Sequence, residues 1–478
     1  MGAQRHGIPV EFDVPSTSVR LMAVTMRVPA PRVRPPTRVT NSAAIVPVCA
    51  LFIIVYWSYK TQVYPTYAYE GYRFRDPDPA WLFAGLVLSL LPLLWLPTQP
   101  RRPSAITLWI IYLFVVVPIC CLTPALPMRS ERWMFGVSIW SVMFLAIASL
   151  SQLPKVVSLP QLHLAPRRAR ALVLIGSVGT FLLLIAKFGF TIGSPDLSII
   201  YTQRLSFRTI LETSNPAYGY LVDWSQVVLA PLAVAVALRR RSAVWMALGT
   251  SILVWAYFVT ATRQALVAIP FAFALYWAGN RRVSGASYAV GGVSLIAVSS
   301  ATFALTGNLY ALGSISERLF AVPGVLGGYY FDYFANRPPV LLRDGVGGFL
   351  SASPYPREMT FQIGLEYLGR VEANANVNVI ADAFANFWLA GLVVAFVLAC
   401  LLWLLDAVTI RLPLGPTMAS LVLVLLAFLN VGLTVAVLTS GFGLIIAMLW
   451  LFGDGLFEAA DHDVRVLVRG CGPSSDRP

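Results

Sequence analysis

Long apolar runs separated by short polar connections dominate the chain from about residue 43 onward. A helix needs roughly 20 apolar residues to cross a bilayer, and about twelve runs approach that length. The pattern therefore predicts an all-α, polytopic integral membrane protein with about twelve transmembrane helices. The predicted spans lie near residues 43–58, 81–97, 105–124, 133–152, 171–190, 218–238, 243–260, 265–279, 286–305, 387–409, 417–437 and 438–454.

Basic residues alternate with these runs in a regular way. If the N-terminus lies inside, every even-numbered connection carries arginine or lysine, as the positive-inside rule requires. These connections hold Arg101, Arg102, Lys155, Arg167, Arg168, Arg170, Arg239, Arg240, Arg241, Arg281, Arg282 and Arg411. We therefore expect both termini in the cytoplasm. The larger outward loops then cover residues 59–80, 191–217 and 307–386.

The two ends of the chain differ from the apolar region between them. Residues 1–41 are rich in proline and arginine and contain no apolar stretch long enough for a signal peptide. We interpret them as a disordered, basic cytoplasmic tail. Residues 42–456 form the predicted transmembrane domain, and residues 457–478 a cytoplasmic C-terminal tail.

The late outward segment, residues 307–386, is expected to organise the function. Charged side chains alternate there with aromatic ones, and an asparagine-rich run then leads back into the bilayer. We expect short helices in this segment, and chemistry where it meets the other outward loops. The first of these, residues 59–80, holds a run of tyrosines suited either to stacking on sugars or to an interfacial aromatic belt.

The amino-acid composition argues against several classes of protein and of binding site. The chain is 58% hydrophobic and only 12% charged, whereas a soluble domain carries about twice that charged fraction. The net charge of +13 comes largely from residues beside predicted spans, so we expect no nucleic-acid partner. Five cysteines and three histidines show neither a disulfide framework nor metal-ligand spacing. We therefore expect no metal and no cofactor.

Three arginines are candidates for binding phosphate. Arg204 and Arg208 are four residues apart in segment 196–212, which reads as an amphipathic surface helix, so they share one face. Paired guanidiniums suit a diphosphate, although snorkelling side chains of an interfacial helix give the same pattern. Arg263 occupies a tight turn between two apolar runs, where a lone arginine is costly unless it pairs or faces a polar cavity. Anchoring the turn is its alternative role.

Carboxylates of the late segment are candidates for acid–base chemistry. Glu366 and Arg370 are also four residues apart, in a short helix predicted over residues 362–371, and Glu372 follows closely. They form either a surface ion pair or a site in which Glu366, or otherwise Glu372, takes a proton from a sugar hydroxyl. Asp382 lies farther on, in the asparagine-rich run.

Two short motifs resemble those of a known family. The turn Thr260-Ala261-Thr262-Arg263-Gln264 is similar to a turn of O-antigen polymerases and ligases. The run from Asn374 to Gly391 resembles the re-entry motif of Wzy-type oligosaccharide repeat-unit polymerases. The resemblance covers roughly residues 194–402.

The resemblance implies a metal-independent glycosyltransferase of the bacterial cytoplasmic membrane that acts on polyprenyl-diphosphate-linked oligosaccharides. Arg263 and Glu366 would be catalytic, and the substrate-binding residues would be Arg204, Arg208, Arg370, Glu372 and Asp382. Membrane lipid and a chain-length regulator are the partners it implies. A ligase is less favoured, because related ligases use a histidine in the late loop and this chain has none there. The rival of another class is a flippase or exporter of the same lipid-linked units.

Overall fold

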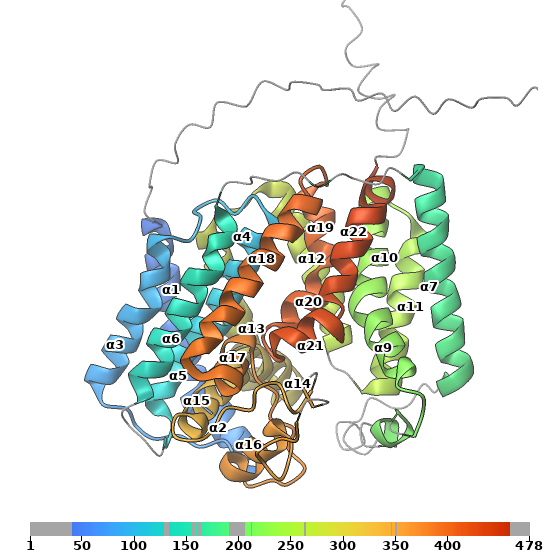
Figure 1. Ribbon diagram of the computed structural model, residues 1–478. Coiled ribbons are helices and arrows are strands. Elements are labelled where there is room, and N and C mark those ends of the chain that lie inside the picture. Colours follow the sequence, from blue (N-terminus) through green and yellow to red (C-terminus); the bar gives the residue numbers. More distant parts are fainter. Residues whose placement is uncertain are drawn as a thin grey trace, which may run out of the picture. The chain divides into compact units, whose positions relative to one another are not determined.

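The computed structural model describes residues 41–128, 133–153, 159, 164–190, 206–211, 213–261, 264–345, 347–348 and 351–458. Every regular element within these ranges is a helix (Figure 1), so the predicted all-α class is confirmed. Nine helices in the described ranges are long and apolar enough to cross a membrane. They are Ser42–Glu70, Pro103–Ala125, Phe135–Gln152, Pro166–Phe188, Ala217–Arg240, Ala243–Thr260, Gly285–Thr306, Val379–Val408 and Leu433–Phe457. A shorter apolar helix covers Pro79–Leu94.

Several of these helices are divided into shorter elements where their hydrogen bonding changes. The first half of the chain contains α1 (Ser42–Ser58), η1 (Tyr59–Val63), α2 (Tyr64–Tyr67), η2 (Ala68–Glu70), α3 (Pro79–Leu90), η3 (Leu91–Leu94), α4 (Pro103–Ile111), η4 (Tyr112–Val116), α5 (Val117–Leu122), η5 (Thr123–Ala125), α6 (Trp133–Ala148), η6 (Ser149–Gln152), α7 (Pro166–Phe188), α9 (Ala217–Trp224), η7 (Ser225–Leu229) and α10 (Ala230–Arg240). The second half contains α11 (Ala243–Thr260), α12 (Gln264–Arg281), α13 (Gly285–Thr306), α14 (Leu309–Ala311), η8 (Leu312–Ala321), α15 (Val322–Phe334), α16 (Met359–Leu368), α17 (Val379–Phe387), η9 (Trp388–Gly391), α18 (Leu392–Val408), α19 (Leu414–Ser420), α20 (Val422–Ala427), α21 (Leu433–Leu438) and α22 (Phe442–Phe457).

The basic connections between helices gather at one end of the described region. The α12–α13 connection meets the α3–α4 connection, where the Gly285 amide donates to the Thr98 carbonyl at 2.9 Å. The α10 terminus meets the end of α22, where Arg239 Nε donates to the Phe457 carbonyl at 3.1 Å. In Figure 1 these ends lie at the top, while α15 and α16 lie at the bottom. The basic connections that alternate along the sequence thus lie at the same end in space.

The first half of the segment predicted as an outward loop over residues 59–80 is a continuation of α1. Helix α1 runs on through η1, α2 and η2 to Glu70. Tyr59, Tyr67 and Tyr72 are buried, and the Tyr59 hydroxyl donates to the Arg73 carbonyl at 2.7 Å. These three rings are therefore part of the protein core, and neither sugar stacking nor an aromatic belt describes them.

The late segment also begins with a buried helix. Residues of η8 and α15 form a continuous helix, and all of α15 is buried. Its polar groups have partners, because the Tyr72 hydroxyl donates to Glu317 Oε1 at 3.0 Å and the Tyr367 hydroxyl to Asp332 Oδ2 at 2.8 Å. Paired in this way, charges that suggested a surface loop are accommodated inside the protein.

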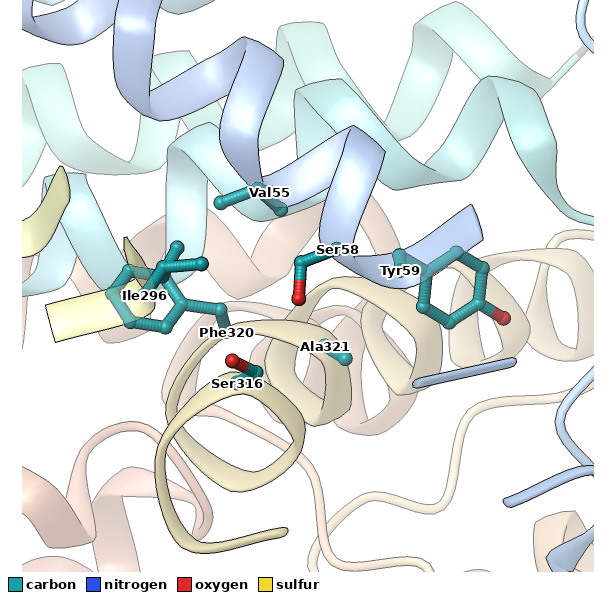
Figure 2. A pocket seen from close by; sticks show the side chains of 7 residues that line it. All are labelled: Val55, Ser58, Tyr59, Ile296, Ser316, Phe320 and Ala321. Carbon is teal, nitrogen blue, oxygen red and sulfur yellow. The ribbon is translucent and has the colours of Figure 1, made fainter. Parts of the chain in front are cut away.

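Figure 2 shows how η8 is attached to the helices around it. Ser316 of η8 and Ser299 of α13 share a hydrogen bond of 2.9 Å between their hydroxyls, and Ser300 donates to Ser58 of α1 at 3.3 Å. Apolar side chains close the rest of the contact and leave no water-sized cavity. The sequence-distant segments 42–58, 285–306 and 312–321 are thereby packed together.

Two predicted spans are interrupted. The span predicted at 417–437 is divided into α19, α20 and α21, with a break over residues 428–432. The span predicted at 387–409 is preceded by α17, and the chain turns at Trp388, where φ is 51°. The start of α17 lies against the break at residues 428–432, since the Val379 amide donates to the Phe428 carbonyl at 3.1 Å. Broken helices leave backbone groups free of intrahelical partners, and such breaks often form binding sites.

Candidate functional site

A cavity of about 210 Å³, lined by both apolar and polar side chains, lies where the late segment meets the break between α20 and α21. Carboxylates, amides and hydroxyls face it together with Tyr330 and backbone. Its polar side chains are Asp344, Glu358, Thr360, Asn376, Asp382, Asn386, Asn430 and Thr434. Among the described residues that line it, none is lysine, arginine or histidine. The titratable acids Asp344, Glu358 and Asp382 are therefore not balanced by a basic side chain in the described lining.

Asp382 is held at this cavity by the start of α17. Asn378 caps that helix, since its Oδ1 accepts from the Ile380 and Ala381 amides at 3.1 Å each. The Asp382 carboxylate lies against Gly432, so closely that a Cβ at Gly432 would overlap it. The asparagine-rich run thus fixes the position of Asp382, and the predicted site residue does face a cavity.

The loop before α16 is held in a strained conformation. Leu341 and Leu342 have φ values of 57° and 60°, in the left-handed region that costs a non-glycine residue about 1–2 kcal/mol. Asn386 stabilises this turn, because its Oδ1 accepts from the Leu342 amide at 2.8 Å and its carbonyl from the Leu341 amide at 3.1 Å. Strain of this kind gathers at functional sites.

Asp344 connects this loop to α16. Its Oδ2 accepts a hydrogen bond from the amide of Met359, the first residue of α16. Glu358, which directly precedes the helix, makes no such bond with its side chain. A carboxylate from fourteen residues upstream of Glu358 therefore performs the capping role.

The helix that carries Glu366 differs from the predicted one. It begins at Met359 and ends at Leu368, because Gly369 turns the chain with φ of 66°. Arg370 lies beyond that turn, so the prediction that Glu366 and Arg370 share a helical face is wrong. Glu372 is exposed farther along the same turn.

Glu366 is half-buried and faces a tyrosine-rich layer rather than the cavity. Gln362 Nε2 lies 3.5 Å from Glu366 Oε1, and the Arg337 guanidinium lies 3.9 Å from the centre of the Tyr333 ring. Burial raises the pKa of Tyr333, an effect that Arg337 opposes and Glu366 reinforces. Burial likewise raises the pKa of Tyr355 to about 12. Both phenols therefore remain protonated at neutral pH.

Arg208 joins the arginine-bearing segment to α16. It belongs to the helical residues 206–211, and its guanidinium carbon lies 5.1 Å from the centre of the Phe361 ring. A cation–π contact of this kind fixes the orientation of the guanidinium plane. Arg204 and Arg263 lie outside the described residues.

The sequence prediction overlooked one side of the site. Asn430, Gly432 and Thr434 line the cavity, yet they fall within a run assigned to a single apolar span. The available signal was the polar and helix-weakening sequence Asn430-Val431-Gly432 in the middle of that run.

Comparisons with known proteins leave the site to be judged from its own geometry. No protein-family model, no curated protein and no solved structure matches this chain.

Proposed function

We propose that this protein polymerises polyprenyl-diphosphate-linked oligosaccharide repeat units at the outer face of the bacterial cytoplasmic membrane. The observation that carries the proposal is the contact between Arg208 and Phe361, which brings an arginine predicted to bind phosphate onto the helix of Glu366. The motif resemblance around Arg263 and Asn374–Gly391 supports it. In this proposal the chain crosses the membrane about twelve times, both termini are cytoplasmic, and α16 lies outside.

The proposed reaction is a transfer between two lipid-linked substrates. The acceptor hydroxyl oxygen forms a bond to the anomeric carbon of the donor glycan, and the bond from that carbon to the lipid diphosphate breaks. Negative charge grows on the diphosphate, so Arg208, with Arg204 and Arg263, stabilises the leaving group. Glu366 accepts the proton of the acceptor hydroxyl. No metal takes part in this scheme.

Polymerisation by the purified full-length protein tests the proposal. The protein is reconstituted in vesicles with a polyprenyl-diphosphate-linked repeat unit, and the products are separated by size. We expect a ladder of increasing repeat number and release of polyprenyl diphosphate. Glu366→Gln should lower the rate about a hundred- to ten-thousand-fold, as loss of a general base typically does.

A matched pair of arginine substitutions tests whether Arg208 binds phosphate. Arg208→Lys keeps the charge but loses the planar two-point contact with phosphate, so we expect most activity to be lost. Arg411→Lys, at an exposed position in a basic connection, should retain it. If the wild-type protein releases no polyprenyl diphosphate and builds no ladder, the polymerase proposal fails.

Export of lipid-linked units is the second candidate function. The helix breaks at residues 387–391 and 428–432 favour it, since discontinuous helices form substrate sites in transporters. An exporter would move the lipid-linked unit across the vesicle membrane without lengthening it. Movement in the absence of any ladder would therefore favour this candidate over polymerisation.

A further inference from the structure

The cavity beside Asp382 is not used by the proposed transfer chemistry. Glu366 lies eight residues from Glu358, which corresponds to about 12 Å along a helix. Arg208 contacts Phe361 and is not among the residues that line the cavity. The cavity therefore needs its own explanation.

The lining of the cavity indicates the chemistry of its ligand. Its polar wall offers carboxylate, amide and hydroxyl oxygens from Asp382, Asn430 and Thr434, with the buried Tyr330 beside them. Carboxylates accept hydrogen bonds from hydroxyl groups, and side-chain amides both accept and donate them. A diphosphate is disfavoured, because the described lining contains acidic side chains and no basic one. A neutral, hydroxyl-rich molecule fits this lining.

Part of the lining is available to such a ligand. Thr360, Asn376 and Thr434 make no side-chain hydrogen bond to another described residue. Others are committed to the walls: Asp344 caps α16, and the Asn386 side chain holds residue 342 and donates to the Asp382 carbonyl at 3.0 Å. The committed groups keep the cavity open and the remaining ones face it, an arrangement typical of a pre-formed ligand site.

We propose that this cavity binds one neutral sugar ring of the acceptor oligosaccharide, with Asp382 and Asn376 hydrogen-bonded to its hydroxyls. The term acceptor rests on the proposed polymerase function, whereas binding of the sugar does not. A chain of a few sugars spans the distance from the cavity to Glu366, so the ring in the cavity is one that positions the acceptor rather than the one that reacts. Placement of the acceptor at two points lowers the entropic cost of transfer.

Saturation-transfer NMR with free monosaccharides tests the site without requiring catalysis. The full-length protein in detergent micelles is mixed in turn with D-glucose, D-galactose, D-mannose and N-acetyl-D-glucosamine. D-glucuronate serves as the anionic counterpart of glucose. We expect saturation transfer to at least one neutral sugar and none to glucuronate, because the carboxylates of the cavity repel it.

Two substitutions assign the signal to the cavity. Asp382→Asn should weaken binding about tenfold or more, and Asn376→Ala about threefold to tenfold, as expected for lost charged and neutral hydrogen bonds. Asn376 is exposed and makes no side-chain hydrogen bond to a described residue, so its replacement leaves the fold intact. Asp76→Asn, in a surface ion pair with Lys60, is the matched control and should bind as the wild type does.

Two results would overturn the inference. One is the absence of saturation transfer to all four neutral sugars, and the other is a signal that Asp382→Asn and Asn376→Ala leave unchanged. Neither result depends on polymerisation. If sugar binding passes these tests but no ladder forms with the lipid-linked substrate, the proposed function fails while the sugar site stands.

Discussion

At Gly432 the backbone has no need of glycine for its own conformation, since φ is −68°. What excludes a side chain there is the Asp382 carboxylate, which occupies the space of a Cβ. Gly432→Ala must therefore displace Asp382 or the start of α21. Overpacking of this kind typically destabilises by about 1–3 kcal/mol, and we expect a lower melting temperature in detergent.

Two further variants test that explanation of Gly432. Gly291→Ala, in α13, introduces a Cβ that meets nothing within 4 Å, so its melting temperature should not fall. In an Asp382→Ser background the carboxylate is absent. Gly432→Ala should therefore lower the melting temperature much less there than in the wild type. Equal costs in the two backgrounds would show that the Asp382 contact is not what requires glycine.

Individual residue types were predicted better than their roles. The asparagine-rich run was recognised as important, but the sequence could not show that Asn378 serves as a helix cap and Asn386 as a support for a strained turn. The Asn378 cap uses amides two and three residues later, whereas the role of Asn386 depends on Leu342 in another segment. The site assignment of Asp382 was a prediction of the same kind, and its place at a cavity follows from packing against Gly432, which is 50 residues away in the sequence.

At the scale of elements, α16 depends on a capping group supplied by the loop before it. Asp344→Ala removes the acceptor of the Met359 amide, and loss of a cap costs about 0.5–2 kcal/mol. We expect faster hydrogen–deuterium exchange at residues 359–362. The control is Glu358→Ala, because the Glu358 side chain makes no capping bond. Equal exchange in both variants would assign the stability of α16 to its packing alone.

Hydropathy predicted where helices lie but not where they break. Residues 417–437 are apolar almost throughout, so a window average cannot detect the interruption at 428–432. The opposite error concerns η8 and α15, whose charged residues suggested an exposed loop. Glu317 and Asp332 accept hydrogen bonds from Tyr72 and Tyr367. These bonds offset the free-energy cost of burying the two carboxylates, and they form only in the folded protein. Such pairing between distant segments leaves no local signal in the sequence.

For the whole molecule, the sequence predicted the membrane class and the common location of the basic connections. Both follow from summed properties, apolar length and charge, that need no knowledge of tertiary contacts. The arrangement of the interior does need such knowledge. An example is Asp406, whose buried carboxylate accepts from the Ser104 amide at 3.0 Å and the Ser104 hydroxyl at 2.7 Å. That pair connects α18 to α4, and a sequence-only argument placed neither residue.

The orientation of the molecule provides the last prediction. The connections after Arg241 and Arg282 lie at the end of the described region opposite α16, and positive charge favours the cytoplasmic side. Reporter fusions at these two positions should therefore be cytoplasmic, whereas one inserted within residues 351–357 should be external. The reporters are an alkaline phosphatase, active only outside, and a fluorescent protein, active only inside. An external reporter at Arg282 would reverse the orientation from that point onward, and the proposed outward site near α16 would then face the cytoplasm.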